Sequence, residues 1–169
     1  MAYQLEQLAA DIRAALAAEP GTAGREASCR LVEKALRDDA FVDTHLRDRA
    51  PGAAPRELLF EDPELGFCIC GHVYGDAAHS QPHDHGATWA IYGQARGRTE
   101  MTDWRIVEAG AGDQPARVEP VESYALEPGQ ARLYDVGAVH APRRAQPSKL
   151  IRIEGRNLDH VQRSNIKAK

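Results

Sequence analysis

The stretch PHDHGATWAIYGQARG, residues 82–97, carries the two signals that decide the fold of this chain. It contains TWAIYGQ (88–94), a short run rich in β-branched and aromatic residues, which is typical of a strand. It begins with His83 and His85, which are separated by a single residue. In an extended chain, residues i and i+2 point the same way, so both imidazoles can approach one point while Asp84 faces away.

Segments of the same kind fill the chain on both sides of this stretch. They are short, several alternate apolar and polar residues, and they are separated by Gly, Pro or Asp: ELLF (57–60), GFCICGHVY (66–74), RTEMTDWRIVEAG (98–110), ARVEPVESYAL (116–126), QARLYDV (130–136) and KLIRIEG (149–155). In EPGQ, Pro128 fixes φ and Gly129 supplies a positive φ, which predicts a type II turn. Many short strands with regular turns predict a mainly β barrel or jelly roll.

The N-terminal part of the chain has a different period. Apolar side chains recur at steps of three and four residues from Leu5 to Leu16, which predicts a helix with one apolar stripe. EPGTAG (19–24) ends this helix. We expect a second helix over residues 25–37 and a short third turn over 41–46.

These patterns predict one compact domain with three parts. A helical cap occupies residues 1–50, a β-barrel occupies 56–156, and a polar C-terminal tail, 157–169, lies on the surface or frays. The linker APGAAP (50–55) separates the cap from the barrel.

The bulk composition excludes several classes of partner. The 169 residues are 43% hydrophobic and 27% charged with a net charge of −4, so we expect binding neither to nucleic acid nor to a membrane. No apolar run approaches the roughly 20 residues that span a bilayer, and the N-terminus lacks the pattern of a secretory signal. We expect a cytoplasmic monomer or homodimer with reduced cysteines, of which Cys68 and Cys70 are buried.

A further histidine follows in YDVGAVHAPRR, residues 134–144. Gly137 permits a tight bend between strands, and this bend can bring His140 back toward the first pair. Three neutral imidazoles bind a divalent transition metal. The spacing therefore predicts a metal site built from two distant segments.

These two segments resemble the two sequence motifs of the cupin superfamily. The first motif is matched by Gly75, His83, His85 and Gly97, and the second by Gly129, Asp135, Gly137 and His140. The resemblance spans about residues 56–156 and implies a cupin double-stranded β-helix, which is a jelly-roll barrel. It also implies a single metal ion held by His83, His85 and His140, with Fe(II) expected and Ni, Mn or Zn as alternatives.

The chain departs from many cupins where they supply a glutamate after the histidine pair. Trp89 and Ala90 stand there, so no carboxylate closes the metal site. The region is similar to cysteine dioxygenase and 3-mercaptopropionate dioxygenase, which hold iron with three histidines. Arg56 matches the arginine that pairs with the substrate carboxylate in that family. The resemblance implies an Fe(II)-dependent dioxygenase whose partners are O2 and a small thiol or other metal-chelating carboxylate.

A late strand shows that the resemblance is to a divergent member. The Ser-His-Tyr triad of the family is replaced in LIRIEG by Leu150, Arg152 and Glu154. We interpret Arg152 as a contact for an anionic substrate group, and Glu154 as a catalytic base or as an ion-pair partner of Arg152. Trp89 and Tyr92 are candidate substrate contacts, or else parts of the barrel wall.

Several residues also have plainer interpretations. Arg56 can form a surface ion pair with a nearby carboxylate instead of binding substrate. His79 is expected in a loop and His72 on a strand outside the site. PRR (142–144) is expected to be a solvated loop.

Two other functions stay open beside a dioxygenase. A cupin isomerase, lyase or hydrolase would use the metal as a Lewis acid, with Glu154 moving protons. A non-catalytic cupin would bind the metal and a small molecule without turnover. Dependence on oxygen separates the first alternative from the dioxygenase, and product formation separates the second.

Overall fold

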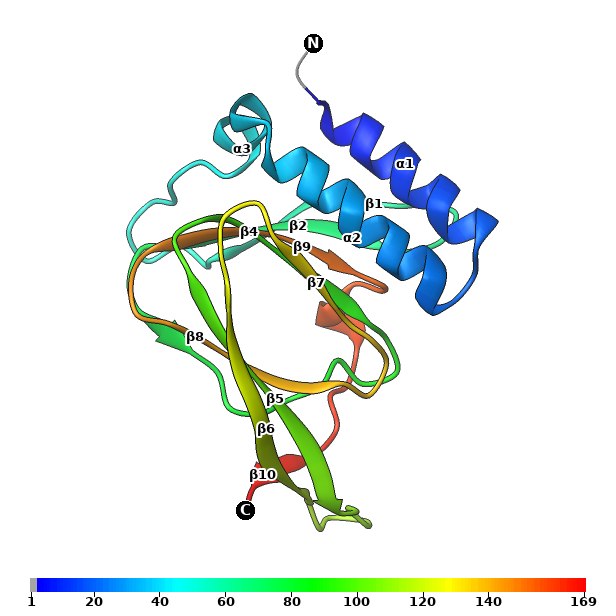
Figure 1. Cartoon of the computed structure of the whole chain (residues 1–169), viewed down its shortest axis with the longest axis vertical. Coiled ribbons are helices and arrows are strands. Elements are labelled where there is room, and N and C mark those ends of the chain that lie inside the picture. The colour runs from blue at the N-terminus through cyan, green and yellow to red at the C-terminus, as the bar shows by residue number, and fades with distance from the viewer. Residues whose placement is uncertain (1–2) are drawn as a thin grey trace.

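The computed structural model describes residues 3–169 and is mainly β, with helices at the N-terminus (Figure 1). The helices are α1 (Leu5–Ala18), α2 (Thr22–Leu36), α3 (Asp39–His45) and a short 3-10 helix, η1 (Leu158–His160). The strands are β1 (Arg56–Glu61), β2 (Cys68–Tyr74), β3 (Ala78–His79), β4 (Ala90–Arg96), β5 (Thr99–Glu108), β6 (Ala116–Leu126), β7 (Ala131–Tyr134), β8 (Val139–Arg144), β9 (Ser148–Glu154) and β10 (Ile166–Ala168). The predicted class is confirmed.

The strands form two five-stranded sheets that curl toward each other (Figure 1). The first sheet has the order β1-β2-β9-β4-β7, and the second has the order β10-β6-β5-β8-β3. The three N-terminal helices cover the outer face of the first sheet (Figure 1). Within residues 3–169, no helix is both long enough and apolar enough to cross a membrane.

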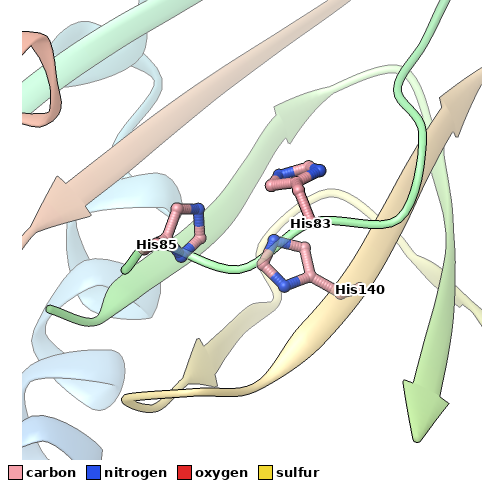
Figure 2. Close-up of side chains that lie close together, drawn as sticks. All are labelled: His83, His85 and His140. Carbon is pink, nitrogen blue, oxygen red and sulfur yellow. The ribbon is translucent and has the colours of Figure 1, made fainter. Parts of the chain in front are cut away.

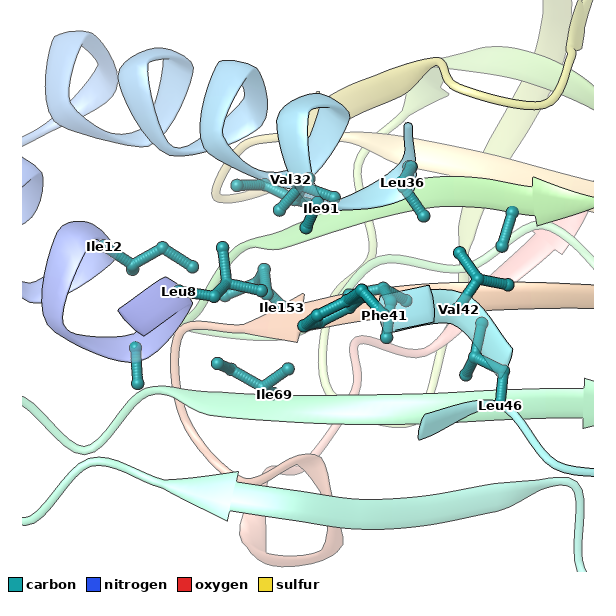
Figure 3. Packing of buried hydrophobic residues seen from close by; sticks show 14 of the residues in the cluster. Leu8, Ile12, Val32, Leu36, Phe41, Val42, Leu46, Ile69, Ile91 and Ile153 are labelled. Atoms are coloured by element: carbon teal, nitrogen blue, oxygen red, sulfur yellow. The ribbon is translucent and has the colours of Figure 1, made fainter. Parts of the chain in front are cut away.

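The largest buried cluster lies between the helices and the first sheet. Helix side chains such as Leu8, Ile12 and Val32 pack against Ile91 and Ile153 on the strands (Figure 3). Because side chains alternate along a strand, the neighbours of these isoleucines point to the other side, into the barrel. The chain therefore separates an apolar helix–sheet core from a barrel interior that also contains polar and charged side chains.

The inward set of the first sheet comes from three adjacent strands. The register pairs Cys70 with Arg152, and Arg152 with Tyr92, across β2, β9 and β4. Cys68 and Cys70 are buried as predicted, and burial raises the pKa of both thiols to about 12. Such thiols are inert at neutral pH.

Strand β8 corrects the expectation that residues 142–144 form a solvated loop. Val139–Arg144 pairs with β5, and Pro142 lies opposite Met101. Proline has no backbone N–H to donate, so in a sequence it predicts the end of a strand. Here the carbonyl of Pro142 accepts a hydrogen bond from Ser80 N at 3.0 Å. The alternation then places His140, Pro142 and Arg144 on one buried face, while Arg143 is exposed.

Two boundaries also differ from the sequence expectations. Helix α2 begins at Thr22, three residues before the predicted start, because Gly21 adopts a φ of 90° and turns the chain directly into the helix. The polar tail adds strand β10, which pairs in parallel with β6. Ser164 N donates to the Asp84 carboxylate at 3.1 Å, so the tail is attached beside the histidine pair.

Gly86, which follows His85, fixes this attachment and makes a testable prediction. Its φ is +61°, and an added Cβ would collide with the carbonyl oxygen of Gln162. Gly86→Ala should cost about 1–2 kcal/mol for the left-handed backbone and roughly 1–3 kcal/mol more for the collision. Urea titration of the free energy of unfolding measures the sum.

Gly112→Ala is the matched control, because Gly112 has a φ of +56° but a Cβ there would meet no atom within 4 Å. We expect only the backbone cost at this position. Equal losses of stability in the two variants would show that the packing of the tail on Gly86 contributes nothing.

Candidate metal centre

Three buried histidines from two distant segments meet inside the barrel. His83 and His85 lie between β3 and β4, His140 lies on β8, and one ring nitrogen of each lies within 4.8 Å of the other two. The rings of all three converge on one region (Figure 2). The backbones of His83 and His140 exchange two hydrogen bonds of 3.0 Å, which locks the two segments together. The structure thus brings together the residues that the two motifs predicted as ligands.

Backbone carbonyls set the orientation of two of the rings. His83 Nδ1 lies 2.8 Å from Gln81 O, and His140 Nδ1 lies 3.1 Å from Ala138 O. A carbonyl only accepts, so each Nδ1 carries the proton and each Nε2 keeps its lone pair for a metal. In this tautomer Nε2 is the ring nitrogen that can bind a metal.

The bend before His140 is held from the helical layer. Gly137 has a φ of 80°, and Ala138 N donates to Asp135 O at 2.9 Å, which closes the tight turn predicted there. The Asp135 carboxylate accepts a hydrogen bond from Thr22 Oγ1 at 2.7 Å and pairs with Arg25, both on α2. Asp135 therefore anchors the turn to the helices.

Tyr92 lies directly beside two of the histidines. Its hydroxyl is 3.1 Å from His85 Nε2 and 3.2 Å from His140 Nε2. A phenol has one proton, so it can donate to only one of these nitrogens at a time. The Tyr134 ring packs on His140 with 4.2 Å between ring centroids and limits the motion of this ligand.

The three imidazoles are neutral at physiological pH. Burial lowers the pKa of His83 to about 4 and that of His140 to about 3, and it lowers the pKa of His85 as well. Within residues 3–169 no carboxylate joins this group; Asp84 faces the C-terminal segment and accepts hydrogen bonds from Gly86 N and Ser164 N. Three neutral nitrogen donors fit a divalent transition metal and leave its charge unreduced.

The lowered pKa values predict metal retention at acidic pH. An ordinary histidine takes up a proton near pH 6.5 and then competes with the metal. Because the folded-state pKa values of His83 and His140 lie near 4 and 3, protons should not displace the metal between pH 7 and about pH 5. Metal content after gel filtration at stepped pH measures this, and half-loss near pH 6.5 would contradict it.

A cavity of about 200 Å³ opens beside His83. Its charged and aromatic lining comes from both sheets and the tail: Arg56, His72, Tyr74, Tyr92, Arg144, Arg152 and Arg163. No aspartate or glutamate lines it. A larger groove of about 650 Å³ lies at the surface near residues 48–53 and includes none of the three histidines.

Two of the predicted substrate residues are engaged within the protein. Arg56 Nε and Nη2 donate to the two carboxylate oxygens of Glu154 at 3.1 and 2.9 Å, and Arg56 Nη1 donates to Asp159 at 2.9 Å. Arg152 Nη2 donates to Glu154 Oε1 at 2.6 Å, and its guanidinium carbon lies 5.5 Å from the centre of the Tyr92 ring. Glu154 thus joins both arginines, from β1 and β9, behind Tyr92.

The other residues considered in the sequence analysis lie in different parts of the structure, and only some of them line the cavity. Trp89 lies in the core cluster that packs on the helices and does not line the cavity, so its position gives no support to a substrate contact. His79 was expected in a loop but lies on strand β3, where it is exposed and is not part of the histidine group. His72 and Arg144 correct the sequence interpretation, because both are 5% exposed and line the cavity. Residues i and i+4 of a strand share a face, so only the recognition of residues 139–144 as a strand would have placed Arg144 with His140.

Comparisons with known proteins identify the fold. No family model and no curated protein sequence matches the chain. A conserved protein of Klebsiella pneumoniae with a double-stranded β-helix domain has a TM-score of 0.50 at 14% identity, covering 74% of this chain and 88% of that one. A cupin superfamily protein of Desulfitobacterium hafniense has a TM-score of 0.45 at 13% identity, with 65% and 84% covered. A hydroquinone 1,2-dioxygenase has a TM-score of 0.48 at 12% identity, with 70% and 71% covered.

At these identities the similarity shows the fold alone. The chain has a double-stranded β-helix fold with a helical layer at its N-terminus, as the two motifs and the helical period predicted. Its chemistry has to be argued from its own residues.

Proposed function

We propose that this chain is a mononuclear, non-haem Fe(II) dioxygenase that acts on a small molecule bearing a metal-binding group, such as a thiol, and a carboxylate. The observation that carries the proposal is the site itself: three buried neutral imidazoles, no carboxylate among them, and an arginine-lined cavity alongside. Bound Fe(II) would supply Lewis-acid and one-electron redox chemistry at positions that the protein leaves open.

The residues around the histidines would position the reactants. The carbonyls of Gln81 and Ala138 hold two Nε2 lone pairs toward one point. The Tyr92 hydroxyl stands beside that point, where it can donate a hydrogen bond to a group bound there. Arg152, behind the ring of Tyr92, holds the ring in place and adds positive charge.

The position of Glu154 favours a dioxygenase over an isomerase or lyase. Glu154 is fully buried and does not line the cavity. Burial alone would raise its pKa, but the hydrogen bond from Arg56 and the charge of Arg152 lower the pKa below its ordinary value. A carboxylate so strongly held is a poor proton shuttle at neutral pH. We therefore assign Glu154 to positioning the two arginines.

Oxygen uptake by protein of known metal content tests the proposal. Protein purified from its source and assayed for metal should contain iron, and it should consume O2 with a thiol carboxylate such as 3-mercaptopropionate. Turnover under strict exclusion of oxygen would overturn the proposal and favour an isomerase, lyase or hydrolase. Ligand binding by calorimetry without any product by mass spectrometry would indicate a binding protein.

A further inference from the structure

Arg144, at the end of β8, is a buried cation with no anionic partner. It is 5% exposed, its Nε is buried without a hydrogen-bond partner, and no carboxylate within residues 3–169 pairs with it. Its guanidinium packs on Tyr74, with the central carbon 4.4 Å from the ring centre. Burial lowers the pKa of Arg144, but a guanidinium keeps its charge at neutral pH. A buried charge without a partner is costly, so an external anion would stabilise it.

The other arginines of the cavity differ from Arg144. Arg56 and Arg152 share Glu154, and Arg56 also pairs with Asp159. Arg163 is exposed, so water can solvate its charge. Among the arginines that line the cavity, Arg144 is therefore the one that a bound anion would stabilise most.

His72 adds a second unsatisfied group to the same wall. It is 5% exposed, its Nε2 is buried without a partner, and its Nδ1 lies 3.3 Å from the Tyr74 hydroxyl. Burial lowers the pKa of His72 well below its ordinary value, so the ring is neutral and can present Nε2–H as a donor. Buried polar groups almost always have a hydrogen-bond partner in folded proteins. Two buried nitrogens without a partner, Arg144 Nε and His72 Nε2, therefore indicate that a ligand binds in this cavity.

We propose that Arg144 and His72 form a carboxylate-binding subsite, and that a small carboxylic acid spans the cavity from this subsite to the metal-binding side at His83. This assignment moves the anion contact away from Arg56, where the sequence resemblance had placed it. It deepens the proposed function and rests on it for the identity of the group at the metal. The volume of about 200 Å³ suits an acid of a few carbon atoms.

Metal-free protein tests the subsite without reference to the metal. Propionate and propionamide have the same shape, and ligand-observed NMR titration compares their affinities. We expect propionate to bind about tenfold or more tightly, as charge-assisted hydrogen bonds require. Arg144→Met should reduce this preference to near one, and Arg144→Lys should retain part of it because the charge remains. Equal binding of acid and amide to the unmodified protein would overturn the proposal.

Arg143→Met is the matched control, since Arg143 is the neighbouring arginine of β8 and is exposed. It should keep the preference for propionate in full. A preference that survives Arg144→Met, with Arg144→Met still folded by circular dichroism, would overturn the proposal. If Arg144→Met does not fold, the intermediate preference expected of Arg144→Lys decides, and an unchanged preference in that variant refutes the subsite.

A second titration separates failure of the subsite from failure of the proposed function. In zinc-loaded protein, which cannot turn over with oxygen, 3-mercaptopropionate should bind more tightly than propionate because thiol and carboxylate are both engaged. If the thiol adds nothing while propionate still depends on Arg144, the thiol assignment fails and the carboxylate subsite stands. If the thiol adds affinity but Arg144→Met leaves the preference of 3-mercaptopropionate over 3-mercaptopropionamide unchanged, the subsite fails alone.

Discussion

Substitution of His140 by alanine should abolish stable metal binding. In the proposed metal site, His140 would supply one of three ligand nitrogens, and it is the one that comes from the second segment. Loss of an outer-shell partner of a ligand typically costs 10–100-fold in metal affinity, so loss of a ligand should cost at least about 100-fold. Competition with a chromophoric chelator, followed by elemental analysis, measures the affinity.

His79→Ala is the control for this loss, because His79 lies four residues before His83 in the sequence but is exposed on β3. It should leave metal affinity unchanged. His140→Ala also removes a fully buried ring that packs on Tyr134, so the metal-free forms have to be compared by circular dichroism first. Equal metal content in folded His140→Ala and unmodified protein would show that His140 is not a ligand and would overturn the three-histidine site.

The cluster of His83, His85 and His140 could be predicted from sequence because local rules govern each of its parts. Two histidines at i and i+2 share a direction in any extended segment, and the glycine of the second motif permits a bend wherever the chain places it. Their meeting required only that the two motifs belong to one barrel. The strands around them were also found, because alternation and turn residues act within a few positions.

Arg144 was missed for an equally local reason. Pro142 interrupts the pattern that a strand normally shows, so β8 did not read as a strand and the side of each residue could not be assigned. In the structure, the carbonyl of Pro142 accepts a hydrogen bond from Ser80 N, and Pro142 stays in register with Met101 on β5. Only that register places Arg144 on the face of His140.

The partner of Arg56 could not be predicted because it depends on sheet order. Arg56 and Glu154 are 98 residues apart and meet because β1 and β9 both flank β2. The alternation of apolar and polar residues identifies single strands but does not show which distant strands become neighbours in a sheet. The nearby carboxylates Glu57, Glu61 and Asp62 were the obvious partners, but Glu57 pairs with Arg49 and Asp62 with Arg13.

Glu154→Gln should lower the free energy of unfolding more than any other single substitution among Arg56, Arg152 and Glu154. The carboxylate is fully buried and holds two guanidinium groups, from Arg56 and Arg152, and it also accepts a hydrogen bond from Leu158 N at 3.0 Å. Removing one side of a buried ion pair leaves an uncompensated charge and costs about 3–5 kcal/mol. For a chain of this size the midpoint of thermal unfolding should fall by roughly 10 °C or more.

Two comparisons make this expectation specific to the buried network, and its pH dependence follows. Glu127→Gln breaks the exposed pair with Arg98 and should cost less than about 1 kcal/mol. The folded-state pKa of Glu154 lies below its ordinary value, so its stabilisation is complete above about pH 4.3 and is lost as the pH falls through the folded-state pKa. Urea titrations should therefore show the gap between unmodified protein and Glu154→Gln closing in acid. A gap that is below 1 kcal/mol at pH 7, or one that persists unchanged in acid, would refute an ionised Glu154 as the residue that holds both arginines.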